Sequence, residues 1–326
     1  MSFTDTLKQK LVNNQYKPTI VYAEGWDQSI YDAAKQLKAN NIVRPILIFR
    51  TETEVFSGID LDYVVIEKMD LTKYATFLYE CRKAKGMTED QAKQLAKQPN
   101  YLASLMVKMG EADGEICGIQ YSTKDTLKPA LQIIKTAPEA KLVCSAFVLE
   151  KGDDQYIFGD CAINLYPDST QLANIAKMLG FFAKDIVSMT NLKIALLSYS
   201  TAGSGAGESV DKVRGAYELL KNDEEAKAFQ IFGEIQFDAS FVPQVMHKKA
   251  KALNWDTNAK IYVFPNIDAG NIGYKIAQRM GGYDAIGPVL IGLDLPVNDL
   301  SRGASTEDVV KLSYITAYQA IIRKSK

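Results

Sequence analysis

Near its C-terminal end the chain reads Pro296-Val297-Asn298-Asp299-Leu300-Ser301-Arg302-Gly303. This stretch follows an apolar, strand-like segment at residues 285–293. It precedes Ser305-Thr306-Glu307-Asp308, which has the form of a helix cap followed by acidic first-turn residues. A hydroxyl, a guanidinium, a glycine and a carboxylate therefore gather where a strand gives way to a helix, and open α/β sheets bind ligands at such crossings. The pattern predicts either a ligand site or a capped helix with a surface pair of Arg302 and Asp308.

Apolar runs of strand length alternate with amphipathic runs of helical length along the chain. The expected strands are residues 19–23, 45–49, 63–66, 114–118, 142–149, 193–198, 229–232, 260–264 and 285–293. The expected helices include residues 28–39, 74–85, 125–135, 171–183 and 271–279. This alternation predicts an α/β fold of βαβ units with mainly parallel sheets. Residues 156–159 are expected to form a local antiparallel excursion, with a turn at residues 151–154.

Composition bounds the class of protein. The chain has 326 residues, of which 47% are hydrophobic, so it can hold two domains with sizeable cores. The formal net charge is −1, so no overall basic field attracts nucleic acid, and we expect no nucleic-acid partner. No apolar run approaches the roughly 18 residues of a membrane span. The N-terminal residues have no basic segment followed by an apolar one, and we expect a cytoplasmic protein without a membrane partner.

The four cysteines, Cys81, Cys117, Cys144 and Cys161, have no metal-type spacing and fit reduced thiols, so we expect no metal site. Two of them, Cys144 and Cys161, lie in or beside apolar, strand-like sequence. A buried thiol is the favoured interpretation there, rather than a nucleophile. The single histidine, His247, has no triad-like neighbours, so a base in this protein is expected to be a carboxylate.

Six blocks in order along the chain resemble the phosphate acetyl/butyryltransferase family. They lie at residues 122–136, 160–164, 197–201, 233–239, 264–279 and 287–303. The resemblance implies an isocitrate/isopropylmalate dehydrogenase-like fold, with two α/β domains flanking a cleft. It implies a first domain at residues 1–141 plus 304–326 and a second domain at residues 142–303. It also implies a homodimer, joined through the domain nearer the C-terminal half.

The resemblance further implies an acyltransferase that moves an acetyl group reversibly between acetyl phosphate and coenzyme A, with no additional cofactor. Asp308 matches the family's proposed base for the thiol, which is mostly protonated at neutral pH. Arg302 matches its phosphate-binding arginine, which can fork onto an anion. Ser301 and nearby amides can donate to the carbonyl oxygen where charge develops.

Further family positions complete the expected site. Ser200 and Thr201 open a glycine-rich segment that can cradle an anion, or can be an ordinary flexible loop. Ser122 and Thr123 stand before an expected helix, where phosphate binding and helix capping are both open. Asn271 belongs to the block at residues 264–279 and is assigned to the phosphate side.

Two basic residues are assigned to the substrates as well. Arg82 matches a family arginine near coenzyme A, and the alternative is a basic helix face. Lys128 stands where the family commonly has arginine, which keeps the charge but loses the bidentate fork. Ala202 and Phe232 also depart from the family, where lysine and aspartate are usual.

These departures leave acyl preference open, so a phosphate butyryltransferase with a longer acyl chain is one alternative. From other classes, the fold also serves metal- and nicotinamide-dependent hydroxyacid dehydrogenases. The sequence has no persuasive set of clustered aspartates and no GxGxxG opening a helix. A non-catalytic binding homologue is the last alternative, and the presence of Ser301, Arg302 and Asp308 argues against it.

Overall fold

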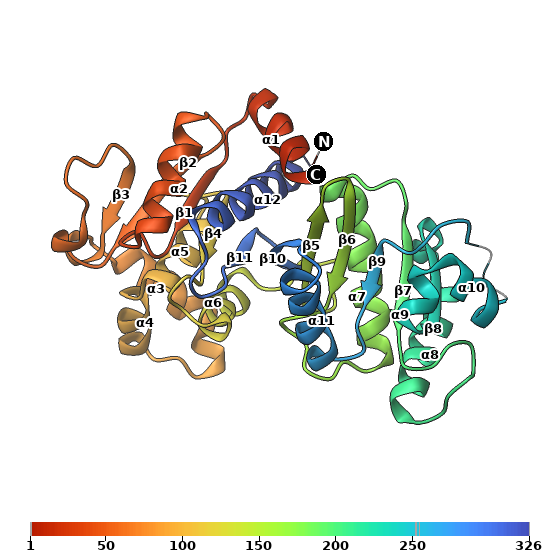
Figure 1. Ribbon diagram of the computed structural model, residues 1–326. Helices are drawn as coiled ribbons and strands as arrows, with labels where there is room; N and C mark the ends of the chain where they lie inside the picture. Colours follow the sequence, from red (N-terminus) through yellow and green to blue (C-terminus); the bar gives the residue numbers. More distant parts are fainter. Residues whose placement is uncertain (1, 252, 254, 326) are drawn as a thin grey trace. The chain divides into compact units, whose positions relative to one another are not determined.

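The structure is a computed structural model that describes residues 2–251, 253 and 255–325 (Figure 1). Its internal contacts divide the chain into two compact units. The N-terminal unit comprises Thr4–Pro138 and Leu293–Lys326, and the central unit comprises Met1–Phe3 and Glu139–Gly292. Both units mix helices with sheets that are mainly parallel, which confirms the predicted fold class.

The N-terminal unit is built on a parallel sheet in the order β11-β4-β1-β2-β3. The strands are β1 (Thr19–Tyr22), β2 (Arg44–Phe49), β3 (Asp62–Val65), β4 (Gly114–Cys117) and β11 (Val297–Asp299). Successive side chains of a strand point to opposite faces. The Tyr22 hydroxyl accordingly meets Ser313 of the C-terminal helix α12 (Thr306–Lys324), at 2.9 Å, while Val21 enters the core on the other face.

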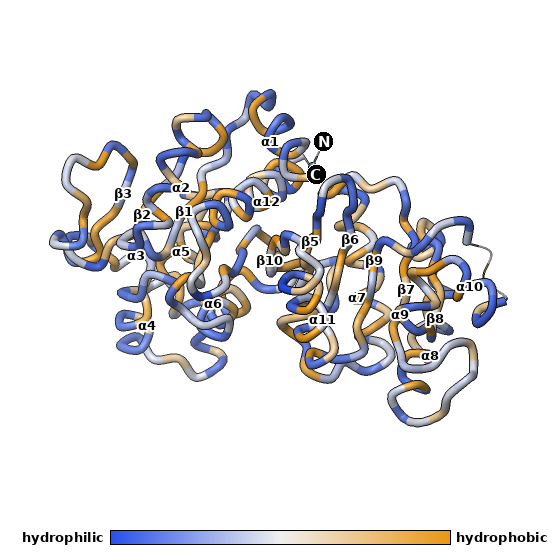
Figure 2. Tube along the Cα trace, in the orientation of Figure 1, coloured by the Kyte–Doolittle hydropathy of each residue, from blue (hydrophilic) through white to orange (hydrophobic). Residues whose placement is uncertain are grey.

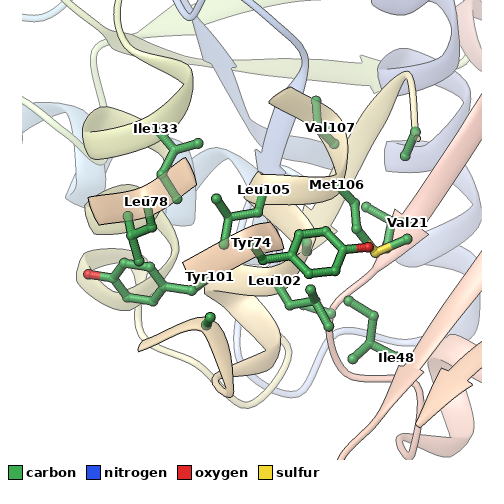
Figure 3. Close-up of a cluster of buried hydrophobic side chains, with 14 of the residues drawn as sticks. Val21, Ile48, Tyr74, Leu78, Tyr101, Leu102, Leu105, Met106, Val107 and Ile133 are labelled. Atoms are coloured by element: carbon green, nitrogen blue, oxygen red, sulfur yellow. The ribbon is translucent and has the colours of Figure 1, made fainter. Parts of the chain in front are cut away.

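Helices cover both faces of this sheet. They are α1 (Phe3–Asn13), α2 (Gln28–Ala39), α3 (Thr72–Arg82), α4 (Glu89–Ala96), α5 (Pro99–Lys108), α6 (Thr123–Pro129) and α12 (Thr306–Lys324). Shorter helical turns are Glu52–Glu54, Ile66–Lys68, Lys83–Lys85 and the π-helical Ala130–Ile134. In Figure 3, Val21 and Ile48 of the sheet lie against Leu102 and Met106 of α5 and Tyr74 of α3. Burying these side chains contributes roughly 1.5–3 kcal/mol for each large apolar group.

The central unit has a mixed sheet in the order β10-β5-β6-β9-β7-β8. The strands are β5 (Cys144–Lys151), β6 (Asp154–Gly159), β7 (Lys193–Leu197), β8 (Gln230–Ile235), β9 (Ile261–Val263) and β10 (Asp284–Ile291). Lys151 pairs with Asp154 in an antiparallel β5–β6 hairpin, which confirms the predicted excursion and its turn. The strands β6, β9, β7 and β8 are parallel, whereas β10 is antiparallel to β5.

The helices of the central unit are α7 (Ser169–Phe182), α8 (Glu208–Lys221), α9 (Phe237–Phe241), α10 (Pro243–Lys249) and α11 (Ile267–Arg279). Two helical turns, Ala183–Val187 and Glu225–Ala228, complete them. In Figure 2, β7 is drawn almost wholly in the hydrophobic colour, while α11 alternates between hydrophobic and hydrophilic residues. A buried strand and an amphipathic helix have these patterns because the strand is enclosed on both faces and the helix on one.

The structure adds a strand that the sequence did not predict. The quoted C-terminal stretch was placed between the expected strand at residues 285–293 and the closing helix and was not among the expected strands, but Val297–Asp299 forms β11 beside β4. Two of its three residues are polar, so no apolar run marked it. Each finds a hydrogen-bond partner: Asn298 donates to the buried Thr316, at 2.8 Å, and Asp299 accepts from Thr123. The chain therefore rejoins the N-terminal unit at Leu293, earlier than the position near Ala304 expected from the family resemblance.

The described residues lack two features, a membrane-spanning helix and a cluster of metal ligands. No helix among them is long and apolar enough to cross a membrane. No group of three or more histidine, cysteine, aspartate or glutamate side chains among them is arranged to hold a metal ion.

Candidate functional site

The turn that follows β11 exposes the central residues of the predicted site. Ser301, Arg302 and Gly303 are all exposed, and the turn closes when the Ala304 amide donates to the Ser301 carbonyl oxygen at 3.0 Å. Gly303 has φ +77°, a left-handed conformation that favours glycine. Within the described part of the chain, the Arg302 guanidinium has no hydrogen-bond or ion-pair partner, so its donors are available to a ligand.

Asp308 lies in the first turn of α12, where it forms a capping box with Ser305. Its Oδ2 accepts from the amide and from the hydroxyl of Ser305, both at 2.8 Å, and its own amide donates to Ser305 Oγ at 3.2 Å. The predicted cap at Ser305 is therefore confirmed. The Asp308 side chain is nevertheless exposed, and its role as a base stays a prediction.

A buried carboxylate holds the segment that follows β4. Glu24, just past β1, has no exposed surface and accepts four consecutive backbone amides, those of residues 118–121, at 2.7–3.3 Å. Burial raises the pKa of Glu24, and the four amides act against that rise. The carboxylate therefore fixes the backbone that leads into Ser122 and Thr123.

A second buried carboxylate links that segment to β11. Asp299 is 1% exposed, and its Oδ2 accepts from the Thr123 hydroxyl at 2.7 Å. Ser122 is the N-cap of α6, where its hydroxyl donates to Asp125 Oδ2 at 2.6 Å. The structure thus brings Thr123 to the strand that ends two residues before Ser301, at the carboxyl edge of the sheet.

The two basic residues assigned to the substrates lie on helices of the same unit. Lys128 is exposed in the last turn of α6. Arg82 ends α3 and is half-buried, and its Nε is a buried donor without a partner among the described residues. Burial raises the pKa of Tyr101 on α5, and the charge of Arg82 acts against that rise.

The glycine-rich segment of the central unit is held by an acid rather than left flexible. Glu234, which is 2% exposed, accepts from Ser200 Oγ at 3.0 Å and from the Gly203 amide at 2.8 Å. Arg214 Nε donates to the same carboxylate at 3.1 Å. Burial raises the pKa of Glu234, but Arg214, the Gly203 amide and the Ser200 hydroxyl together hold it below its usual value.

Both hydroxyls of the predicted anion cradle are therefore engaged by residues at the end of β8 and just beyond it. Ser200 and Thr201 are buried, and Thr201 Oγ1 accepts from the Gln236 amide at 3.0 Å. The Glu234 carboxylate already accepts the hydrogen bonds that Ser200 and the Gly203 amide would otherwise donate to a bound anion. The phosphate-binding role of Ser200 and Thr201 stays a prediction.

Asn271 lies in the first half of α11 and donates to the Cys161 carbonyl oxygen at 3.2 Å. The loop that it meets is organised by Asp160, a buried acid that accepts the Ser145 and Asn164 amides at 3.2 and 2.8 Å. An added Cβ at Gly270 would lie 2.5 Å from the Asp160 carbonyl oxygen, so only glycine permits this approach of α11. The contact orients Asn271, whose substrate role stays a prediction.

The two cysteines considered as possible nucleophiles, Cys144 and Cys161, are buried. Cys144 and Cys161 have no exposed surface, as expected for structural thiols. Burial, with a further contribution from Asp160, raises the pKa of each thiol well above its ordinary value. A thiol in that state is a poor nucleophile.

The sequence analysis did not single out the buried acids that hold the segments carrying the predicted site residues. Glu24 lies two residues past β1, Glu234 is the last residue but one of β8, and Asp299 is the last residue of β11. An acid near the carboxyl end of a strand was the available signal. Their partners lie between 20 and 176 residues away, so no local pattern could reveal the contacts.

The chain matches the family model described as "Phosphate acetyl/butaryl transferase" over residues 2–317. It belongs to this family. A phosphate acetyltransferase of Mycoplasma pneumoniae is 48% identical over 324 residues, which cover 98% of this chain and 100% of that protein. A phosphotransacetylase structure from Streptococcus pyogenes matches with a TM-score of 0.91 and 40% identity, over 99% of this chain and 100% of that one.

The fold extends beyond the family. The structure of 4-hydroxythreonine-4-phosphate dehydrogenase from Klebsiella pneumoniae matches with a TM-score of 0.50 and 13% identity, over 94% of this chain and 99% of that one. At that identity the likeness concerns the fold alone. It agrees with the dehydrogenase-like architecture that the sequence blocks implied.

The departures from the family pattern lie outside the exposed turn. Ala202 has φ +48° and its amide donates to the Glu234 carbonyl oxygen at 3.1 Å. Phe232 packs edge-on against Trp255, with ring centroids 6.4 Å apart. Neither contact involves Ser301, Arg302 or Asp308.

Proposed function

We propose that this chain is a phosphate acetyltransferase that converts acetyl phosphate and coenzyme A reversibly into acetyl-CoA and phosphate. The observation that supports it most is the family match along residues 2–317, together with an exposed Ser301-Arg302 turn whose guanidinium has no partner among the described residues. Its partners are then coenzyme A, acetyl phosphate and phosphate. The proposal includes a cytoplasmic location, which four unpaired cysteines fit.

In the proposed reaction, Ser301 and Arg302 of the exposed turn and Asp308 of α12 each have one role. Asp308 takes the proton of the coenzyme A thiol, because the thiolate is the reactive form. Attack on the acyl carbon places negative charge on the carbonyl oxygen, to which Ser301 and neighbouring amides donate. The acyl C–O bond then breaks, and Arg302 binds the departing phosphate with two parallel hydrogen bonds.

The transfer occurs in one complex that holds both substrates. Bringing two reactants together can itself remove several kcal/mol from a barrier. The enclosed thiols of Cys144 and Cys161 offer no accessible nucleophile, which supports direct attack by coenzyme A rather than an acyl-enzyme. Lys128, Arg82, Ser122, Thr123, Ser200, Thr201 and Asn271 are assigned to substrate binding.

Thioester absorbance tests the proposal. The purified chain is mixed with coenzyme A and acetyl phosphate, or with coenzyme A and butyryl phosphate. A parallel mixture contains NAD, a divalent metal and a hydroxyacid. We expect rapid thioester formation with acetyl phosphate and no NAD reduction. Faster reaction with butyryl phosphate would favour the butyryltransferase, NAD reduction the dehydrogenase, and inactivity in every mixture a binding protein.

A further inference from the structure

The bond between Thr123 and Asp299 is unusually well defined by its surroundings. Thr123 begins α6, Asp299 ends β11, and their side-chain oxygens are 2.7 Å apart. Asp299 Oδ1 has no hydrogen-bond partner in the described part of the chain. It lies against Gly118, where an added Cβ would be 2.3 Å away, and Gly118 has φ +110°. A side chain at position 118 would therefore collide with the carboxyl group, so glycine keeps the place that Asp299 occupies open.

The charge state of Asp299 decides which atom supplies the hydrogen. An ionised carboxylate only accepts, so the hydrogen in this bond must belong to the Thr123 hydroxyl. Thr123 Oγ1 then offers only lone pairs to anything else that it meets. Phosphate oxygens are acceptors as well, and two acceptors cannot form a hydrogen bond. In this arrangement Thr123 is suited to a ligand that donates.

Asp299 is ionised at neutral pH but close to its titration range. Burial raises its pKa to about 6, the hydroxyls of Thr123 and Thr126 lower it, and the charge of Glu24 raises it. The other titratable group facing it is the buried thiol of Cys117 at the end of β4. When Asp299 is protonated it can donate to Thr123, and the hydroxyl hydrogen is then free to turn outward.

The position of this bond places it beside the proposed reaction site. Asp299 is two residues before Ser301, so their Cα atoms are at most about 7.6 Å apart. Thr123 is partly exposed at the same edge of the sheet. A change in the direction of the Thr123 hydroxyl would therefore act next to the Ser301-Arg302 turn.

We propose that Asp299 is a positioning residue that turns the hydroxyl hydrogen of Thr123 inward, so that Thr123 accepts a hydrogen bond from coenzyme A. The donor is the thiol or an amide N–H of the same molecule. This inference rests on the proposed function and refines it, because the sequence had assigned Thr123 to phosphate. Thr123 contacts coenzyme A, and Asp299 acts through Thr123.

Steady-state kinetics with each substrate varied in turn test the assignment. Thr123→Val keeps the shape of the side chain and removes the hydroxyl, and Asp299→Asn removes the charge that sets its direction. Both should raise the KM for coenzyme A about tenfold, the size expected for one hydrogen bond. The KM for acetyl phosphate should stay within about twofold, and Thr123→Ser should restore coenzyme A binding.

Two readouts separate positioning from a merely structural role. The double variant Thr123→Val/Asp299→Asn should be no worse than Thr123→Val alone, because one residue acts through the other. In the wild type, kcat/KM for coenzyme A should fall as the pH drops through about 6, the range set by the Asp299 pKa. That fall should be absent from both single variants.

A matched control removes the same kind of bond elsewhere in the unit. Ser104 donates to the buried Glu115 at 2.6 Å, so Ser104→Ala should change the unfolding midpoint and leave the KM for coenzyme A unchanged. A raised KM for acetyl phosphate in Thr123→Val would overturn the inference. So would additive effects in the double variant with an unaltered pH profile. A wild-type chain that forms no thioester would instead refute the proposed function.

Discussion

At the scale of single residues, the exposed Arg302 is the sharpest test of phosphate binding. Arg302→Ala removes the two-pronged donor and should lower turnover by about 100-fold or more, as loss of one charge-stabilising donor does. Arg302→Lys should recover only part of the activity, because a point charge replaces a planar fork. Steady-state assays measure both variants.

The exposed Arg44 at the start of β2 provides the control, since Arg44→Ala removes an equal charge from the amino end of another strand of the same sheet. Its kinetics should match the wild type. Turnover of Arg302→Ala at the wild-type level would remove Arg302 from the site.

Asp308 caps α12 through Ser305 and is also the proposed base, and two variants can separate these roles. Asp308→Asn keeps the shape that caps α12 and removes the charge that accepts a proton. Turnover should fall strongly while the KM for coenzyme A changes little. The deficit should shrink as pH rises from 6.5 to 9, because solution then supplies more thiolate.

Ser305→Ala is the complementary variant, because it weakens the capping box and leaves the Asp308 carboxylate in place. It should cost about 1 kcal/mol of stability without a comparable loss of turnover. A deficit in Asp308→Asn that is constant across the pH range would place the base elsewhere.

At the scale of elements, β4 carries a buried acid that makes stability depend on pH. Burial raises the pKa of Glu115 to about 8, Ser104 lowers it and Glu24 raises it. The folded chain therefore holds a proton that the unfolded chain releases above its ordinary pKa of about 4.3. Stability is fully present below that value and is lost as pH rises through about 8, by at most about 1.4 kcal/mol per pH unit.

Glu115→Gln should flatten this dependence, because the amide stays neutral. Urea unfolding at pH 6 and pH 8.5 measures it, and Glu89→Gln, at an exposed acid of α4, is the control. An equal loss of stability between the two pH values in wild type and Glu115→Gln would show that Glu115 is not the titrating group.

The elements also show where sequence reasoning was sufficient. The predicted helix at residues 28–39 coincides with α2, because its cap and apolar spacing are local signals. The strand β11 was missed, since it exists only through pairing with β4, which lies far away in sequence. The residues of the proposed site came from the family resemblance, whereas the acids that hold them required coordinates, because their partners are distant in sequence.

At the scale of the whole molecule, the family resemblance predicts a homodimer joined through the domain nearer the C-terminal half. In the central unit, α11 and the residue that caps its C-terminus expose Ile272, Ile276 and Met280, which are spaced four residues apart and share one face. We expect this face to meet a second copy. Sedimentation at micromolar concentration should show a dimer, and Ile276→Lys should convert it to a monomer.

Leu131 in the N-terminal unit is an exposed leucine outside this face, so Leu131→Lys should leave the dimer intact. A monomer in the wild type would refute the dimer. A dimer that survives Ile276→Lys would move the interface to another surface.

Isotope exchange between labelled phosphate and acetyl phosphate tests the central claim, direct transfer in one complex, most directly. With coenzyme A present, the wild-type chain should move label from phosphate into acetyl phosphate, and Arg302→Ala should not. Without coenzyme A, no label should move, because no acyl-enzyme forms. Exchange in the absence of coenzyme A would contradict direct transfer, and no exchange in its presence would contradict the proposed activity.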